Sequence, residues 1–307
     1  MSTSISRMAV LAASLALAAQ AAHASTFQQQ VAADPSGEVD VSNISGDIVI
    51  NGWDKPTVSV TADLPGSTQR VKISTDHGRT SVCVTYNSRG CNSPGSSYDG
   101  SFGDDSSVRL EIYVPRRSEV DVSGVSADIR SRGVAGAQQL RSVSGDIDAE
   151  LGSGDDEAQS VSGDVRLQGS GRDGRLRVTS VSGNVTVKNV AGELEARTVN
   201  GRLEAGLSTA RMARLNTTSG DIDLKAALDQ GGTVESETVS GTQKIQVGGG
   251  YAYEVKTFSG DIDDCFGQKS ERNSEYGPGR HLDGTRGAGG GHIRLQSLSG
   301  DISLCDR

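Results

Sequence analysis

A six-residue motif, seen in full as Ser-Val-Ser-Gly-Asp-Ile at 142–147, recurs along this chain at a nearly constant interval. Clear copies span 142–147, 160–165, 180–185, 217–222, 257–262 and 297–302, and weaker copies span 43–48, 124–129, 198–203 and 238–243. Counted from the motif glycine, or from Ala127 in its place, the copies between 127 and 260 are 18 to 21 residues apart. A period near twenty that persists over so many copies is typical of a protein built from stacked structural repeats.

Apolar residues recur at fixed offsets from the motif glycine: seven, five and two residues before it, and two residues after it. Offsets that differ by two, with polar residues between them, indicate half-buried β-strands. We therefore expect each column to stack aliphatic side chains in a common core. The column two residues before the glycine comprises Ile44, Val125, Val143, Val161, Val181, Val199, Val239, Phe258 and Leu298.

Each repeat is predicted to hold two short strands with a bend at the Ser-Gly pair, where glycine can take positive φ without steric cost. Strands of successive repeats that pair in register would form an all-β, parallel, β-helix-like solenoid. The alternative is a β-sandwich of paired sheets, but a sandwich does not require one motif at near-constant spacing on every second strand. At about 4.8 Å per rung, the repeats from 127 to 300 would form a body about 40 Å long.

The chain divides into four predicted segments. Residues 1–24 have the charged start, short apolar run and small-residue end of a signal peptide, and the run is too short to span a membrane. Residues 25–51 hold the first repeat copy. Residues 52–118 contain four strand-like stretches and a Gly/Ser/Asp-rich loop at 87–107, and they are predicted to cap the solenoid end, whose backbone would otherwise be unpaired. Residues 119–307 hold the remaining repeats.

The charge of the chain limits its partners. The formal net charge is -9, and removing the predicted leader, which carries one arginine and no acid, makes it -10. An acidic chain without a basic run is a poor partner for nucleic acid or anionic lipid. We therefore expect an exported protein, periplasmic, secreted or on the cell surface, with no membrane span and no nucleic-acid partner.

Four cysteines in an exported chain predict two disulfides. Cys83 and Cys91 flank a turn-like stretch and are predicted to staple one hairpin. Cys265 and Cys305 each lie five residues after a motif glycine. Equivalent positions on neighbouring rungs are about 4.8 Å apart, which lies within the range of α-carbon separations that a disulfide spans. This pairing implies that 266–291 is mostly an excursion loop rather than a full rung.

The order of these parts carries a family resemblance. An early Asn-Ile-Ser-Gly-Asp-Ile at 43–48, an Asn-Gly-Trp-Asp at 51–54, a strand at 108–115 and then serial Ser-Gly-Asp-Ile units resemble the bacterial putative-adhesin family, a domain of unknown function. The likeness runs from about Phe27 to Leu304. It implies a β-solenoid-like envelope or secreted protein, in a family associated with cell-envelope stress systems, and it brings no catalytic residues.

The acids that follow the motif glycines are the main candidate site. We expect them to align on one outer edge, where a column of carboxylates is able to hold Ca²⁺, which prefers several oxygen ligands. The alternative is that these side chains accept hydrogen bonds from backbone N–H groups at the bend. The calcium candidates are Asp146, Asp164, Asp221 and Asp261.

An enzyme is the second hypothesis, because paired outward acids could act on a glycosidic bond in a carbohydrate-active β-helix. Sugar-stacking residues are scarce, since the only tryptophan is Trp53. His281 and His292 could hold a metal with Asp283, although a solvated loop is the simpler reading. We therefore predict a protein that is not an enzyme and has no cofactor. Its partner would be an unidentified envelope or surface component, protein or polysaccharide, bound on the repeat face or by loops 87–107 and 266–291.

Overall fold

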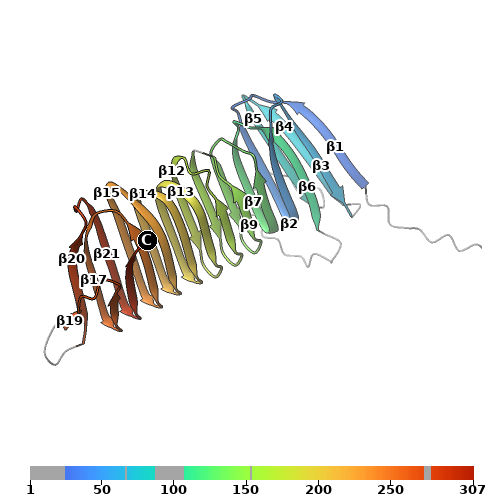
Figure 1. Cartoon of the computed structure of the whole chain (residues 1–307). Helices are drawn as coiled ribbons and strands as arrows, with labels where there is room; N and C mark the ends of the chain where they lie inside the picture. Colours follow the sequence, from blue (N-terminus) through green and yellow to red (C-terminus); the bar gives the residue numbers. More distant parts are fainter. Residues whose placement is uncertain (1–24, 66–67, 87–106, 153, 273–277) are drawn as a thin grey trace, which may run out of the picture.

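The structure is a computed structural model that describes residues 25–65, 68–86, 107–152, 154–272 and 278–307. Within these ranges all regular secondary structure is β, and the strands stack along one elongated body (Figure 1). The fold is all-β and β-solenoid-like, as predicted. The predicted signal peptide, most of loop 87–107 and Cys91 lie outside the described residues.

The strands are β1 (Ser25–Ala32), β2 (Glu38–Trp53), β3 (Thr57–Leu64), β4 (Gln69–Asp76), β5 (Arg79–Tyr86), β6 (Val108–Pro115), β7 (Glu119–Arg132), β8 (Gln138–Ser142), β9 (Ile147–Glu150), β10 (Asp155–Ser160), β11 (Val165–Gln168), β12 (Asp173–Ser180), β13 (Val185–Asn200), β14 (Leu203–Ser219), β15 (Ile222–Ser240), β16 (Gln243–Gly248), β17 (Tyr251–Ser259), β18 (Ile262–Asp264), β19 (Glu271–Arg272), β20 (Arg280–Arg286), β21 (Gly291–Ser299) and β22 (Ile302–Asp306).

Strands of successive repeats pair in parallel, with the motif copies in register. The residue two positions after the motif glycine shows this alignment, since Ile147 pairs with Val165 and Val165 pairs with Val185. The same column continues through Leu203 and Ile222 to the later repeats. Each motif copy therefore defines one rung, and we name a rung by its motif residue.

The core is a set of aliphatic columns that run along the body. The columns seven and five residues before the motif glycine, and two and four after it, are buried at nearly every rung. The columns at seven and five before and at two after were predicted to lie inside, and they do. Because β-branched and aliphatic side chains stack on equivalent residues above and below, each rung buries apolar area on both neighbours.

The column two residues before the glycine was predicted to lie in the core, and this prediction was wrong. Its members from Val125 onward are 40% to 56% exposed, and Ile44 is only partly buried. Alternation along the strand turns the seventh, fifth and third residues before the glycine inward, and so it turns the second outward. From the Gly145 rung onward, the third residue before the glycine is a buried Ser or Thr, as at Ser142, whose hydroxyl accepts a hydrogen bond from the Gly145 N–H at 2.9 Å.

Asp156 is a carboxylic acid in a core column, on the Gly163 rung. It is 6% exposed, and its Oδ1 accepts a hydrogen bond from the Gln138 backbone N–H at 2.9 Å. Burial raises the pKa of Asp156 from 3.8 to about 6, although the hydrogen bond from Gln138 opposes the shift. The folded protein therefore favours the protonated acid, and ionisation of this group near neutral pH opposes folding.

We expect Asp156→Asn to stabilise the protein at neutral pH. Because the pKa is raised in the folded state, the wild-type free energy of unfolding falls as pH rises from about 4 to 6 and stays lower above that range. A shift of about two units sets an upper limit of about 3 kcal/mol for the gain above pH 6. Urea unfolding from pH 4 to pH 8 should show the two proteins converging near pH 4. Asp155→Asn, at the exposed neighbour, is the control, and an equal gain there would contradict the assignment.

The rungs at the C-terminal end do not follow chain order. β21 pairs in parallel with both β15 and β17, and β22 pairs with both β16 and β18. The Gly300 rung therefore lies between the Gly241 rung and the Gly260 rung. Segment 266–291 was predicted to be mostly loop, but it includes β20, which pairs antiparallel with β17. The structural reason is that β17 has only one rung beside it, so β20 covers its other edge.

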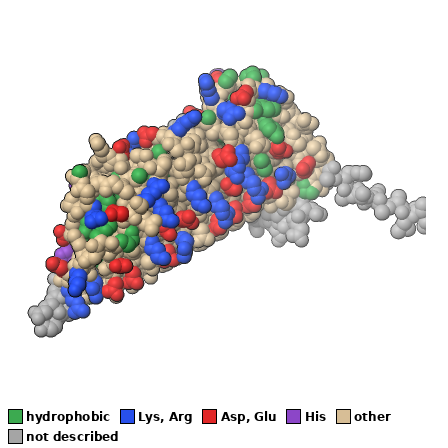
Figure 2. Space-filling view, in the orientation of Figure 1, with side chains coloured by type: hydrophobic (Ala, Val, Ile, Leu, Met, Phe, Trp, Pro, Cys, Tyr) green, Lys and Arg blue, Asp and Glu red, His purple; other side chains and the backbone are tan. Residues whose placement is uncertain are grey.

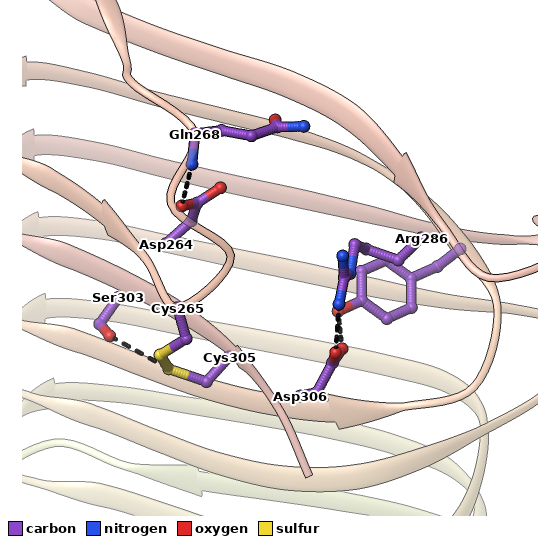
Figure 3. The surroundings of a disulfide bond; sticks show 8 residues. Asp264, Cys265, Gln268, Arg286, Ser303, Cys305 and Asp306 are labelled. Atoms are coloured by element: carbon purple, nitrogen blue, oxygen red, sulfur yellow. Dashed lines mark hydrogen bonds and ion pairs between the residues drawn. A yellow bond between two sulfur atoms is a disulfide. The ribbon is translucent and has the colours of Figure 1, made fainter.

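Side-chain contacts join the inserted Gly300 rung to the end of the body (Figure 3). The predicted disulfide between Cys265 and Cys305 is present, with 5.0 Å between the α-carbons. Arg286 of β20 forms an ion pair with Asp306 at 2.7 Å. Asp264 accepts a hydrogen bond from the Gln268 backbone N–H at 2.8 Å. The Gly300 rung is thus linked to the Gly260 rung by the disulfide and to β20 by the ion pair.

At the other end, the first rung continues into antiparallel strands. The first half of β2 pairs with β5, and its second half pairs with β6. β5 pairs antiparallel with β4, β6 with β3, and β3 with β1. β5 and β6 therefore cover the backbone edge of the Gly46 rung, and β4, β3 and β1 extend the sheet beyond them.

Candidate interaction surface

The exposed column forms an apolar row along the outside of the body, interrupted at one rung. We call it the ridge; its members, in order along the body, are Val125, Val143, Val161, Val181, Val199, Val239, Leu298 and Phe258. Thr218 holds the same position on the Gly220 rung, between Val199 and Val239. Nine rungs at about 4.8 Å make the ridge about 38 Å long. An extended row of exposed apolar side chains is a candidate interaction surface.

A furrow with a volume of about 640 Å³ runs beside the ridge over five successive rungs. One wall is the ridge itself, and the other is formed by the residues four positions before the motif glycine. The residues of this second wall are Thr179, Arg197, Asn216, Glu237 and Gln296. The volume is within the range of about 300–1,000 Å³ that is usual for ligand sites. The sequence pattern gives no signal for these residues, because the furrow depends on the angle of the bend.

The second wall of the furrow is available for contacts. Within the described residues, the side chains of Thr179, Asn216, Glu237 and Gln296 form no hydrogen bond or ion pair, whereas Arg197 pairs with Glu195 at 2.5 Å. One positive and one negative charge leave this wall neutral overall. Unpaired amide, hydroxyl and carboxylate groups beside an apolar row offer both hydrogen bonding and apolar burial to a partner.

Further from the ridge, the residues six positions before the motif glycine are paired with one another. From the Gly183 rung to the Gly260 rung, arginine and glutamate alternate in this column, and basic and acidic side chains lie next to each other over much of the face shown in Figure 2. The ion pairs are Arg177 with Glu195 at 3.1 Å, Arg214 with Glu235 at 2.8 Å, and Arg294 with Glu254 at 3.2 Å. Exposed pairs of this kind add little stability each.

The calcium candidates lie on one outer edge, where each takes part in the contact between rungs. Asp146 accepts a hydrogen bond from the Asp164 N–H at 2.9 Å, and Asp164 accepts one from the Asn184 N–H at 2.9 Å. Asp221 likewise accepts one from the Thr242 N–H at 3.0 Å. The Asp261 N–H donates to a carboxylate of the next rung.

Arginines neutralise the same column of acids. Arg166 pairs with Asp146 at 3.4 Å and with Asp164 at 2.6 Å. Arg202 pairs with Asp221 at 3.2 Å. In the part of the chain that the structure describes, no cluster of three or more His, Cys, Asp or Glu side chains is arranged to hold a metal ion. What the geometry does show for these acids is hydrogen bonding from rung to rung.

These features define an all-β protein of stacked repeats, with a β-solenoid-like body and an apolar ridge along its outside. The chain belongs to the Toastrack DUF4097 family, which matches residues 36–305. No curated protein matches it. Within the described ranges, no helix is both long enough and apolar enough to cross a membrane.

Solved structures of similar proteins have low sequence identity to this chain. A putative adhesin from Parabacteroides distasonis is 13% identical, covers 93% of this chain and 98% of its own, and has a TM-score of 0.34. A putative cell adhesion protein from Clostridium sporogenes is 8% identical, with 92% and 100% covered and a TM-score of 0.24. A putative adhesin from Parabacteroides merdae is 12% identical, with 72% and 93% covered and a TM-score of 0.24.

Proposed function

We propose that this protein is an exported, non-catalytic interaction protein of the cell envelope or of the secreted fraction. It acts as an adhesin-like contact protein or as a scaffold in envelope stress, and it contacts its partner through the ridge and the furrow. The observation that carries the proposal is the exposed apolar ridge, which runs the length of a rigid repeat body beside a neutral furrow. The disulfide between Cys265 and Cys305 supports an oxidising compartment, and residues 1–24 are proposed as the signal peptide that leads there.

The same proposal gives each segment a role. Residues 119–307 present the contact surface, and residues 52–118 cap its first rungs. The acids at the bends hold the rungs together through backbone N–H groups rather than carrying chemistry. The ridge is suited to contact because backbone hydrogen bonds to neighbouring rungs hold its residues in place, whether they lie in a strand, as Val199 does, or in a bend, as Val161 does.

The test is binding of the mature chain, residues 25–307, to washed cell envelopes of the source bacterium, measured by co-sedimentation. We expect saturable binding that falls at least tenfold when Val181, Val199 and Val239 are all replaced by lysine. The control carries Gln168→Lys, Thr186→Lys and Gln246→Lys, which add the same charge on outward positions of β11, β13 and β16. Equal binding by all three proteins would overturn the role of the ridge. Release of reducing ends from a polysaccharide panel would overturn the non-catalytic assignment.

A further inference from the structure

We propose that the occupant of the ridge and furrow is a second copy of this chain, so that the protein self-associates as a dimer with parallel bodies. The inference rests on the proposed function in one respect only, since it takes the ridge and furrow as a contact surface. Three properties of that surface point to a second copy: its pitch, its charge and its size.

The pitch of the ridge equals one rung, about 4.8 Å, because backbone hydrogen bonds join successive rungs at the ridge, as from the Ser162 N–H to the Val143 carbonyl and from the Ser182 N–H to the Val161 carbonyl. A second copy is the partner whose side chains are certain to repeat at the same interval. Contacts made by Val181 on its rung can then be repeated by Val199 and Val239 on theirs, without loss of register. Such a match lets apolar contact extend along the whole ridge.

The ridge and the furrow lie side by side and both run along the body, the furrow over five of the nine rungs of the ridge, so a projecting row and a groove are parallel to each other. A twofold axis parallel to the body, placed between them, would set the ridge of each copy in the furrow of the other. A twofold axis across the body would instead place ridge on ridge. The shape therefore selects parallel bodies with equal rungs at equal height, and the interface is isologous.

The contact strip avoids the repulsion expected between two acidic chains. The chain has a net charge of -9, yet the column that borders the ridge on the bend side is uncharged and exposed. Its members, in order along the body, are Ser126, Ser144, Ser162, Ser182, Asn200, Ser219, Ser240, Ser299 and Ser259. On the other side, Arg197 and Glu237 cancel in the furrow wall. Two such strips can approach without burying a net charge.

The size of the strip suits a stable dimer. The five furrow rungs contribute the positions four, two and one before the motif glycine, which are 15 residues, and the other four rungs contribute the last two of these positions, which are 8 more, so each copy offers 23 residues. Stable interfaces use about 20–30 residues a side. The centre of the strip is aliphatic and its borders are polar, which is the usual arrangement of an interface.

The test is sedimentation equilibrium of the mature chain with its disulfides intact, over the micromolar range. We expect a dimer, and we expect the variant with lysine at Val181, Val199 and Val239 to dissociate at least 100-fold more readily. The control variant with lysine at Gln168, Thr186 and Gln246 should remain dimeric. Far-UV circular dichroism and the Tm of both variants should match the wild type, so that lost association is not lost folding.

Orientation is tested with spin labels on Val143→Cys and, separately, Leu298→Cys. Parallel bodies predict a short label-to-label distance in both dimers, whereas antiparallel bodies predict a long distance in both and would overturn the arrangement. A wild-type chain that is monomeric throughout, or a dimer indifferent to the ridge lysines, would overturn the dimer. If the chain is monomeric but the ridge lysines abolish envelope binding, the surface serves another macromolecule and the proposed function stands. If the chain is monomeric and the ridge lysines leave envelope binding unchanged, both the dimer proposal and the proposed function are overturned.

Discussion

Replacing Gly163 by alanine should lower the free energy of unfolding by about 3 kcal/mol, because the stack leaves no space for a methyl group. A Cβ on Gly163 would lie 2.0 Å from the Gly145 carbonyl oxygen and 2.5 Å from its carbonyl carbon. Both are backbone atoms of the neighbouring rung, so relief requires the rungs to separate. Urea unfolding at fixed pH measures the change.

Gly206→Ala is the matched control, since a Cβ there would meet its nearest atom at 3.8 Å. Its free energy of unfolding should stay within about 1 kcal/mol of wild type, because a compatible Gly→Ala change mainly restricts the unfolded chain. A loss at Gly163 no larger than that at Gly206 would show that the bend is wider than the structure indicates.

The glycine was predicted from its conformational freedom, and the structure adds a second reason. Gly201, Gly241, Gly260 and Gly300 do take positive φ, between 143° and 155°. Gly163 does not, and there it is the close approach of the neighbouring backbone that excludes a side chain. Ala127 fits the equivalent position because β2 and β7 pass through it as unbroken strands rather than bending.

The stacking of the repeats and the register of their rungs could be predicted from the sequence, because a motif at constant spacing must occupy equivalent places on successive rungs. The ridge could not be identified from the motif alone, since valine at Val161 or Val181 suggests burial by its chemistry. The alternation of the strand carried the correct signal: the buried residue is the hydroxyl-bearing neighbour, Ser160 or Ser180.

The order of the last rungs was also beyond the sequence. The spacing of Cys265 and Cys305 correctly implied that their rungs are neighbours. It does not determine which of the two rungs lies at the end of the body. The insertion of the Gly300 rung is decided by β20, whose seven residues pair antiparallel with β17 and close the end. Only long-range strand pairing contains that information.

Replacing Cys265 and Cys305 together by serine removes the disulfide and should strongly lower the stability of the C-terminal rungs. The bond closes a loop of 40 residues, and the loss of that constraint should destabilise the C-terminal rungs by about 4 kcal/mol. Among the described residues, β17 and β18 of the Gly260 rung pair with the Gly300 rung and with β20 and not with β15 or β16, so apart from the chain connection from β16 to β17 this rung is held through the Gly300 rung. Release of the inserted rung therefore releases its outer neighbour as well.

Hydrogen exchange resolves where the stability is lost, since repeat bodies open locally and each rung depends on its neighbours. Without the disulfide, we expect protection to fall in β17, β18 and β20 to β22, while β7 to β13 keep their wild-type exchange rates. The wild type under reducing conditions should lose protection in the same C-terminal strands. Uniform loss along the body would mean that the repeats unfold as one unit. Unchanged protection in β21 would mean that strand pairing alone retains the inserted rung.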